Sequence, residues 1–255
     1  MATSPETLRQ REFLKDTIRL KMDFRQVDQN RGVPPPPAQK PAGDNADTIP
    51  LTDFRRLRKR FRADLFSVLN SRRSVRTYLP DPLDIDELSL LLWATQGVTE
   101  ALSPSVTLRT APSAGARHAL ETYIYARNVD GLTEGVYRYL PLDHALVLEF
   151  EAPGSAPRVA AACLGQTFVG AASCVLFWAT VPYRMEWRYG LAAHRVIPID
   201  AGHVCQNLYL ACEAIGAGTC AIGAYDQGAV DDFLRLDGQD EFVIYLAPVG
   251  KKPEQ

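Results

Sequence analysis

Three arginines and a serine gather within a short stretch that could bind a phosphate group. Residues 71–78 read Ser-Arg-Arg-Ser-Val-Arg-Thr-Tyr, and the residues with phosphate-binding chemistry are Arg72, Arg73, Ser74 and Arg76. Each guanidinium is a planar, permanently charged fork that matches phosphate oxygens, and the hydroxyl and backbone N–H groups add neutral donors. A solvated basic turn is the alternative, because runs of like charge are commonly surface features. Composition alone does not favour one interpretation over the other.

Two other stretches combine small side chains with glycine. The first covers residues 110–117 and contains Pro112, Ser113, Ala114 and Gly115; the second covers residues 219–225 and contains Ile222, Gly223 and Ala224. Backbone that carries little side-chain bulk can approach a flat ligand closely. A nucleophilic serine is not expected at Ser113, because no Gly-x-Ser-x-Gly pattern surrounds it. A dinucleotide fingerprint is not expected around Gly223, because its glycines should open a helix, whereas these follow one.

The composition excludes several classes of function. The 255 residues carry a net charge of −2, with 46% hydrophobic and 23% charged residues, so a sizeable core is expected and a broad basic surface for nucleic acid is not. No apolar run reaches transmembrane length, and the N-terminus lacks the apolar segment of a signal peptide, so no membrane partner is expected. The five cysteines have no C-x-x-C spacing and indicate reduced thiols in a cytoplasmic protein. Among candidate metal ligands only His203 and Cys205 lie close together, so no metal site is expected.

Residues 1–50 predict an N-terminal arm ahead of the main domain, residues 51–255. Residues 6–23 alternate charged and apolar side chains as a short amphipathic helix does. The consecutive prolines at 34–37 then force an extended polyproline conformation, and the segment stays rich in Pro, Gly, Asp and Ala to residue 50. We expect the arm to lie along a surface, that of a partner subunit being one candidate. A disordered tail and a ligand of an SH3-type domain are the alternatives.

Periodicity and capping signals predict the elements that position these stretches. Apolar residues at positions 54, 57, 61, 65 and 68 predict one helix over 52–70 that leads into the arginine-rich segment. Asp84 and Glu87 predict a capping box for a helix that ends before Gly97. Pro198 and Asp200 suit the first turn of a long helix over 198–217. Shorter helices are predicted over 156–164 and 230–236, and strands over 120–128, 134–140, 145–150, 171–181 and 241–249.

Four motifs, in this order, resemble the FMN-dependent nitroreductase superfamily. They are Ser-Arg-Arg-Ser-Val-Arg at 71–76, Ala-Pro-Ser-Ala-Gly-Ala-Arg at 111–117, Asp-Ala-Gly-His-Val-Cys-Gln-Asn-Leu at 200–208 and Ala-Ile-Gly-Ala-Tyr-Asp at 221–226. The resemblance covers about residues 65–251. Its nearest branch is the SagB-type dehydrogenases, which include the azoline oxidases of thiazole- and oxazole-containing peptide pathways. The segment Asp-Gln-Asn-Arg-Gly-Val-Pro-Pro-Pro at 28–36 also looks like the leader of stand-alone members of this branch.

The resemblance implies an α+β fold with a mostly antiparallel central sheet flanked by helices. It further implies an intertwined homodimer with two FMN molecules at the interface. By this likeness the FMN phosphate would be held by Arg72, Arg73, Ser74 and Arg76, with Lys251 or Lys252 completing the site. The loop of the other subunit that would pack beside the isoalloxazine consists of Pro112, Ser113, Ala114 and Gly115. The turn of Ile222, Gly223 and Ala224 would bind the cofactor, with the backbone of the last two near flavin N5 and O4.

The activity implied by the resemblance is that of an FMN-dependent oxidoreductase with two half-reactions through reduced flavin. The flavin carries the hydride chemistry, and the protein positions and tunes it. NADH or NADPH is the expected donor, and a nitro- or quinone-like compound is one kind of acceptor. The flavin could instead oxidise a substrate and return electrons to oxygen. The substrate would be a small molecule or a peptide.

The residues that would act on the substrate depart from the nearest relatives. Azoline-oxidising members use a Lys-Tyr pair ahead of the long helix, and the matching residues here are Arg188 and Tyr189. Arginine effectively cannot lose its proton, so a base role at position 188 is in doubt, whereas the tyrosine could still take the task. The two residues could also merely wall the pocket. An azoline dehydrogenase, which would need a partner that presents the peptide, and a non-enzymatic flavin-binding scaffold are the alternative functions.

Overall fold

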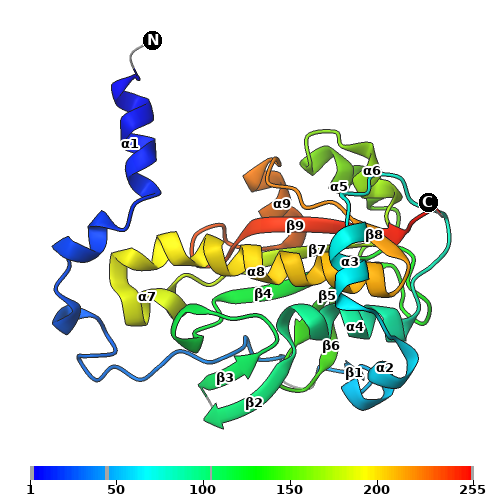
Figure 1. Cartoon of the computed structure of the whole chain (residues 1–255), viewed down its shortest axis with the longest axis horizontal. Helices are drawn as coiled ribbons and strands as arrows, with labels where there is room; N and C mark the ends of the chain where they lie inside the picture. Colours follow the sequence, from blue (N-terminus) through cyan, green and yellow to red (C-terminus); the bar gives the residue numbers. More distant parts are fainter. Residues whose placement is uncertain (1–2, 44–45, 104, 254–255) are drawn as a thin grey trace.

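A seven-stranded antiparallel sheet forms the centre of the fold (Figure 1). The computed structural model describes residues 3–43, 46–103 and 105–253. In this part of the chain the strand order is β1-β6-β5-β4-β7-β9-β8, and every neighbouring pair is antiparallel. The strands are β1 Thr48–Pro50, β4 Leu120–Ala126, β5 Gly135–Leu140, β6 Ala145–Glu151, β7 Cys174–Thr180, β8 Ala217–Thr219 and β9 Phe242–Lys251. The predicted α+β fold with a mostly antiparallel sheet is confirmed.

Helices cover both faces of this sheet. One face carries α4 Ile85–Gln96 and α8 Ala193–Ala214, and the other carries α5 Ala156–Ala162, α6 Thr167–Ala171 and α9 Gln227–Leu234. Each pair of layers encloses its own cluster of buried apolar side chains. The result is a three-layer arrangement in which the sheet is buried on both sides.

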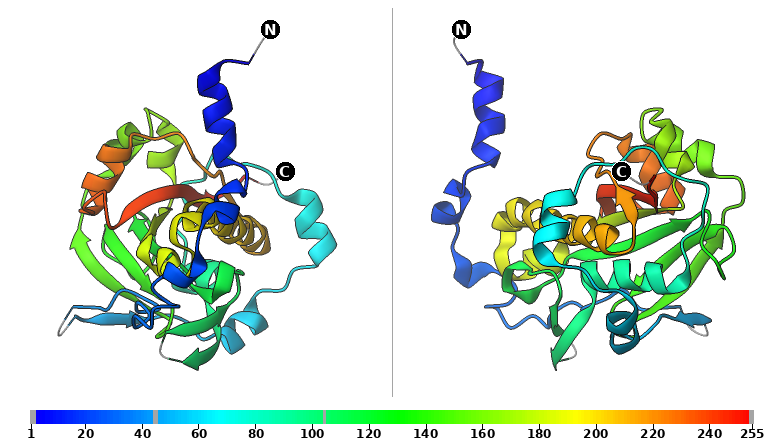
Figure 2. Two further views of the ribbon diagram at one scale, coloured as in Figure 1. Left: turned by 90° about the vertical axis from the view of Figure 1, so that its left-hand side faces the viewer. Right: turned by 45° about the vertical axis from the view of Figure 1, so that its right-hand side comes forward.

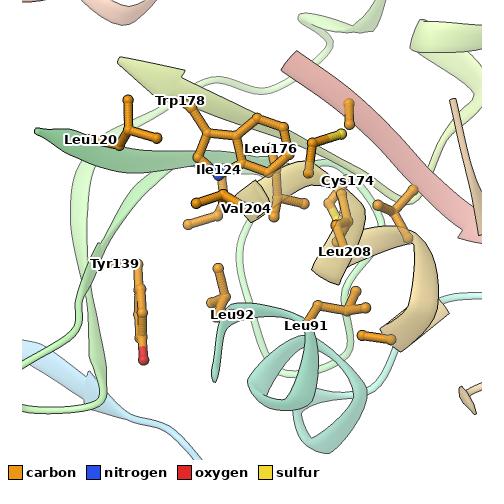
Figure 3. Close-up of a cluster of buried hydrophobic side chains, with 14 of the residues drawn as sticks. Leu91, Leu92, Leu120, Ile124, Tyr139, Cys174, Leu176, Trp178, Val204 and Leu208 are labelled. Carbon is orange, nitrogen blue, oxygen red and sulfur yellow. The ribbon is translucent and has the colours of Figure 1, made fainter. Parts of the chain in front are cut away.

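Strand β7 shows how the sequence builds these two cores. Its nearly continuous apolar run is buried along its whole length, as expected for a strand covered on both faces. Because successive side chains in a strand point to opposite faces, Leu176 and Trp178 join the cluster under α4 and α8, whereas Val175 and Phe177 join the other. Figure 3 shows the first of these clusters, in which Trp178 and Leu176 lie with side chains of α4 and α8.

The predicted capping box at the start of α4 is confirmed. The backbone N–H of Glu87 donates to Asp84 Oδ1 over 2.9 Å, and the backbone N–H of Asp84 donates to Glu87 Oε2 over 3.0 Å. Two backbone donors that the first turn leaves without partners are thereby satisfied. The helix ends at Gln96, before Gly97, as the sequence indicated.

Three predicted helices depart most from their expected bounds, and smaller shifts occur at α5 and α9. The helix over 52–70 is two helices, α2 Phe54–Arg60 and α3 Leu65–Ser71, because the chain is extended at Phe61 and Asp64 caps the second helix by accepting from Ser67 N over 2.8 Å. The long helix begins at Ala193, not at Pro198, which lies inside α8 and cannot donate to the carbonyl of residue 194. The helix over 6–23 is α1 Pro5–Phe13 followed by 3₁₀ turns over Thr17–Lys21 and Phe24–Gln26.

Two elements next to the site had no counterpart in the sequence analysis. A separate hairpin joins β2 Val98–Ser103 to β3 Val106–Arg109, directly ahead of the small-residue loop at 110–117. Helix α7, Tyr183–Tyr189, follows β7, and a short 3₁₀ turn over Gly190–Ala192 leads from it into α8. The α7 helix carries both residues that were predicted to act on a substrate.

The N-terminal arm lies along its own chain. Figures 1 and 2 show α1 standing away from the rest of the fold, while the segment after it runs back along α7 and beneath the sheet. There the backbone N–H of Lys40 donates to Glu121 over 2.7 Å, and its ammonium lies 2.6 Å from Glu241. Arg138 donates to the carbonyls of Lys40 and Pro41. Residues 1, 2, 44 and 45 of the predicted arm lie outside the described part of the chain.

Some kinds of site have no counterpart in the residues that the structure describes. None of the helices there is long and apolar enough to cross a membrane. The same residues contain no group of three or more His, Cys, Asp or Glu side chains that could hold a metal ion. All five cysteines are buried and free, and burial raises the pKa of the Cys205 thiol to about 12.

Candidate functional site

The arginine-rich segment leaves the end of α3 and lies beside β8. The backbone N–H of Val75 donates to the carbonyl of Thr219 over 2.9 Å, and Ser74 pairs with the same residue in a parallel bridge. A Cβ placed on Gly218 would lie 2.6 Å from the Val75 side chain, so the glycine permits this close approach. The segment is thereby fixed to the sheet at its backbone, while Arg73, Ser74 and Arg76 are exposed.

The guanidinium groups of this segment have no acidic partner in the described part of the chain. Among the described residues, Arg73 donates to the carbonyls of Asn70 and Arg72, each over 2.8 Å. Arg72 lies over the ring of Tyr209 at 5.3 Å, and Arg76 lies over the ring of Phe168 at 6.0 Å. Three permanent positive charges next to the exposed residue Ser74 therefore remain available to an anion. These residues fit a phosphate group.

Tyr209 of α8 connects this segment to the glycine turn. Its hydroxyl lies 3.1 Å from the hydroxyl of Ser74 and accepts a hydrogen bond from the backbone N–H of Ala221 over 2.9 Å. The structure thus brings the predicted phosphate-binding residues and the predicted turn together on one side of α8. Tyr209 was not predicted as a site residue, because nothing local in a helical pattern shows which tyrosine contacts a loop elsewhere in the chain.

The turn at 222–224 is anchored by its first residue and open at its second. Ile222 is buried, and its backbone N–H donates to the carbonyl of Leu246 over 2.8 Å. Gly223 and Ala224 are exposed, and a Cβ placed on Gly223 would meet no atom within 4 Å. The protein's own packing therefore does not require a glycine there. An open glycine beside a cationic segment fits a flat ligand with a phosphate tail.

The two lysines at the end of β9 point to different partners. Lys251 forms an ion pair with Glu87 of α4. Lys252 lies 2.7 Å from Glu213, which also accepts a hydrogen bond from Ser71 over 2.8 Å. Of the two predicted lysines, Lys252 is therefore the one whose side chain borders the start of the arginine-rich segment.

The small-residue loop is held by the other half of α8. The backbone N–H of Ala114 lies 3.3 Å from both carboxylate oxygens of Asp200, and the N–H of His118 donates to Ser113 Oγ over 2.9 Å. Asp200 is buried, which raises the pKa of its carboxyl, while hydrogen bonds from Ser113 and Ala114 act in the opposite direction. Pro112 and Gly115 remain exposed on this loop.

Gly115 packs directly against the two residues predicted to act on the substrate. It has a φ of 60°, and a Cβ there would lie 2.6 Å from Arg188 Nε and 2.7 Å from the Tyr189 hydroxyl. Only glycine allows this backbone conformation and this contact together. The structure therefore brings the loop, Arg188 and Tyr189 into one group within a single chain.

The loop group and the arginine group lie on opposite sides of α8. Asp200, which holds the loop, and Tyr209, which holds the arginine-rich segment, are nine positions apart (200 to 209) in one helix. Nine residues correspond to about 13.5 Å along the axis and about two and a half turns. Figure 1 likewise shows α7 at one end of α8 and α3 towards the other. One chain thus presents two separate groups of candidate site residues.

Comparisons with known proteins identify relatives over most of the chain. The model of the nitroreductase family matches residues 69–251. The protein MJ1384 of Methanocaldococcus jannaschii, whose name assigns it to the nitroreductases, is 39% identical over 191 residues, which cover 74% of this chain and 92% of that protein. The trifolitoxin-processing protein TfxB of Rhizobium leguminosarum bv. trifolii is 29% identical over 174 residues, covering 62% of this chain and 45% of TfxB. A crystal structure from Ralstonia eutropha that also carries the nitroreductase name superposes with a TM-score of 0.65 at 26% identity, covering 87% of this chain and 100% of that one.

Proposed function

Since this chain belongs to the nitroreductase family of oxidoreductases, we propose that it is an FMN-dependent enzyme that works through two half-reactions. The observation that carries the proposal is the arrangement around Tyr209. Three arginines without acidic partners in the described part of the chain and an exposed glycine turn are joined there by one hydroxyl. Bound FMN would supply the hydride chemistry, and the chain supplies binding and orientation.

The residues present assign a role to each part of this arrangement. The residues that would hold the phosphate are Arg72, Arg73, Ser74, Arg76 and Lys252. The three arginines form no ion pair with the described residues, and Lys252 shares Glu213 with Ser71 at the start of the segment. Several guanidinium groups bind a dianionic phosphate through charge-assisted hydrogen bonds, which are stronger than hydrogen bonds from neutral donors. Ile222 anchors the turn, and the backbone of Gly223 and Ala224 would face the flavin ring. Lys251 contributes indirectly, by fixing β9 to α4 through Glu87.

A second copy of the chain would complete the site. The loop of Pro112, Ser113, Ala114 and Gly115 lies on the far side of α8 from the arginines of its own chain, so it would serve the flavin held by a partner. Helix α3 also presents exposed apolar side chains, with Leu65 59%, Phe66 81% and Leu69 51% exposed. Such a face next to a binding site is typical of a protein interface. The proposed assembly is therefore a homodimer with FMN at the interface.

The homodimer can be tested separately from the chemistry. Phe66→Glu places a charge on the exposed face of α3 and should give a folded monomer that has lost its flavin. Leu142→Glu, at a position 44% exposed on the turn between β5 and β6, serves as the control. It should leave the oligomeric state and the flavin content unchanged. Light scattering and the visible spectrum report the two outcomes. A Phe66→Glu dimer with full flavin content would reject this interface.

The substrate half-reaction would involve Arg188 and Tyr189. Through Gly115 they adjoin the loop that would lie beside the partner's flavin, so they would wall the substrate pocket. Tyr189 Oη is the group there that can hold or move a proton, whereas the guanidinium of Arg188 keeps its charge. A nitro- or quinone-like small molecule is the proposed acceptor, with NADH or NADPH as donor.

Azoline oxidation in peptide maturation is a second candidate function. The similarity to TfxB, whose name describes the processing of trifolitoxin, favours a peptide substrate and the SagB-type branch. A partner that presents the peptide would then be needed. The arginine at position 188 counts against it, since the lysine of azoline-oxidising relatives can act as a base and arginine effectively cannot.

One experiment tests the central proposal. The purified protein should be yellow and should release FMN on denaturation, and anaerobic addition of NADH or NADPH should bleach its visible flavin band. Readmission of a quinone or an aromatic nitro compound should restore the band. A protein that binds no FMN would reject the proposal, and one that binds FMN without bleaching by any donor would favour a flavin-binding scaffold.

A further inference from the structure

The arm is fastened along the whole length of α7. The backbone N–H of Gln29 donates to the carbonyl of Trp187 over 2.9 Å, and the indole N–H of Trp187 donates to the carbonyl of Val33 over 2.9 Å. At the other end of the helix, the Tyr183 hydroxyl donates to Asp28 over 2.8 Å. These bonds use backbone and side-chain groups from both partners. The segment around Gln29 therefore has a defined position beside the helix that carries Arg188 and Tyr189.

Gln29 also holds the side chain of Arg188. The Nη1 of Arg188 donates to Gln29 Oε1 over 3.0 Å. In the part of the chain that the structure describes, Arg188 has no carboxylate within ion-pairing distance, and its buried Nε has no hydrogen-bond partner. Its anchor is thus a neutral amide. A carboxylate at position 29 would hold the guanidinium equally well but would neutralise it.

A second guanidinium, that of Arg117, lies near enough to Arg188 for the two charges to interact. Arg117 is 3% exposed, stacks over the ring of Trp187 at 4.9 Å, and has a buried Nε without a partner among the described residues. Burial, followed by the charges of Arg188 and Arg184, lowers the pKa of Arg117. The nearby Arg184 already pairs with Glu121. Neither Arg117 nor Arg188 forms an ion pair with the described residues, so their two charges together favour an anion.

We propose that Gln29 positions Arg188 as a cation that is not neutralised and that selects substrates carrying an anionic group such as a carboxylate. This inference rests on the proposed function only in assigning Arg188 to the substrate side of the site. It makes the arm a fixed wall of that site and Gln29 a positioning residue. The amide of Gln29 orients the guanidinium of Arg188, and the nearby charge of Arg117 adds to the positive potential.

The test compares two acceptors that differ in charge. The flavin-loaded enzyme is assayed with para-nitrobenzoate and para-nitrobenzamide under one nicotinamide donor. The wild type should prefer the benzoate through a lower KM. Gln29→Leu should reduce kcat/KM for the benzoate at least about tenfold, the scale of one hydrogen bond to a charged group, and leave the benzamide nearly unchanged. Gln29→Glu should also lose the preference for the benzoate. The glutamate still accepts a hydrogen bond from Arg188, but its negative charge neutralises the guanidinium.

Two controls separate positioning from a general structural effect. Gln39→Leu makes the same change elsewhere on the arm, where Gln39 bonds to Leu142 and Asp143, and should keep the preference for benzoate. The double variant Gln29→Leu with Arg188→Leu should be no worse than Arg188→Leu alone, because one residue acts through the other. The inference is overturned if Gln29→Leu keeps the preference for the benzoate. It is also overturned if the wild type reduces both acceptors without any preference.

A measurement without flavin distinguishes this inference from the proposed function. Labelling of Arg188 by phenylglyoxal, followed by peptide mapping of the flavin-free protein, should be faster in Gln29→Leu than in the wild type and in Gln39→Leu. Benzoate should slow it in the wild type. If the protein binds no FMN and turns over no substrate, the proposed function fails. The inference is still supported in that case if Arg188 is labelled faster in Gln29→Leu and benzoate protects it in the wild type. Equal labelling rates in all three proteins overturn it.

Discussion

The hydroxyl groups of Ser74 and Tyr209 lie 3.1 Å apart, although the two residues come from the arginine-rich segment and from the long helix α8. The same tyrosine oxygen accepts from the backbone of the glycine turn at Ala221. One side chain therefore sets the distance between the groups proposed to bind the phosphate and those proposed to face the flavin ring. This relationship makes Tyr209 the most informative residue to change.

Tyr209→Phe should weaken FMN binding while the protein stays folded. The change leaves the Ala221 N–H without its acceptor, which should lower the free energy of unfolding by about 1 kcal/mol at this partly buried position. Fluorescence titration of FMN and chemical denaturation measure the two effects. Tyr137→Phe, which loses a hydroxyl bonded to the carbonyl of Thr133, is the control for stability and should bind FMN normally. Equal FMN affinity in both variants would remove Tyr209 from the site.

Arg72→Glu should yield a folded protein that purifies without FMN. The substitution replaces attraction by repulsion at a dianionic phosphate, and it removes no ion pair that the structure describes. The absorbance ratio of flavin to protein after purification measures occupancy. Arg58→Glu, at an exposed position of α2, makes the same change of charge outside the segment and should keep its flavin. Full occupancy in Arg72→Glu would contradict the phosphate assignment.

Tyr189→Phe should affect one half-reaction only. The ring and its contacts remain while the hydroxyl that faces Gly115 is lost. FMN content and reduction by the nicotinamide donor should be unchanged, and turnover of the physiological substrate should fall by roughly 10²-fold or more, the scale of a lost general acid–base group. Stopped-flow absorbance separates the two half-reactions. If both proceed at wild-type rates, Tyr189 is only a wall of the pocket.

His118 should make the protein less stable in mild acid. Burial, followed by the charge of Arg109, lowers the pKa of His118 from 6.5 to about 3, against the raising effect of its bond to the Thr107 carbonyl. Below about pH 6.5 the unfolded chain binds a proton that the folded chain does not, so the free energy of unfolding falls as the pH falls, until about pH 3.

The measurement compares wild type and His118→Asn at two pH values. Asparagine tolerates the positive φ of 47° at this position. At pH 8 the difference in unfolding free energy is the cost of the substitution alone. At pH 5 it should shift by about 2 kcal/mol in favour of the variant, because the histidine penalty is absent. An unchanged difference would mean that His118 takes up its proton in the folded state.

Local sequence signals predicted the elements whose structure depends on residues a few positions apart. The Asp84–Glu87 capping box and the apolar run of β7 were predicted because both depend on neighbours a few residues away. The break between α2 and α3 was not, because the apolar period continues across it. The side chains Leu65, Phe66 and Leu69 that should have marked α3 as packed are exposed in this chain. A period alone does not show whether the chain covers that face.

Candidate site residues could be named from the sequence where a motif is contiguous, and they were missed where distant residues assemble it. The arginines, the small-residue loop and the glycine turn each lie within a few residues and became candidates through motifs that resemble a known family. Tyr209 and Gln29 were not, because their roles depend on partners far along the chain; Gln29 and Arg188 are 159 positions apart. The placement of the two residue groups on opposite sides of α8 was not predicted either. It depends on which loop Asp200 contacts and which segment Tyr209 contacts.

The bond between Lys40 and Glu241 joins residues 201 positions apart, which has a consequence for synthesis. Lys40 leaves the ribosome long before Glu241 exists, so this ion pair forms only after the other partners of the arm, Glu121 and α7, have been made. If the pair is needed to hold the arm, the segment around Gln29 should become fixed beside Arg188 only after β9 emerges. Stalled nascent chains that end before Glu241 should leave the arm open to protease, and chains extended past β9 should protect it. Equal protection in both would show that the arm docks on α7 without the last strand.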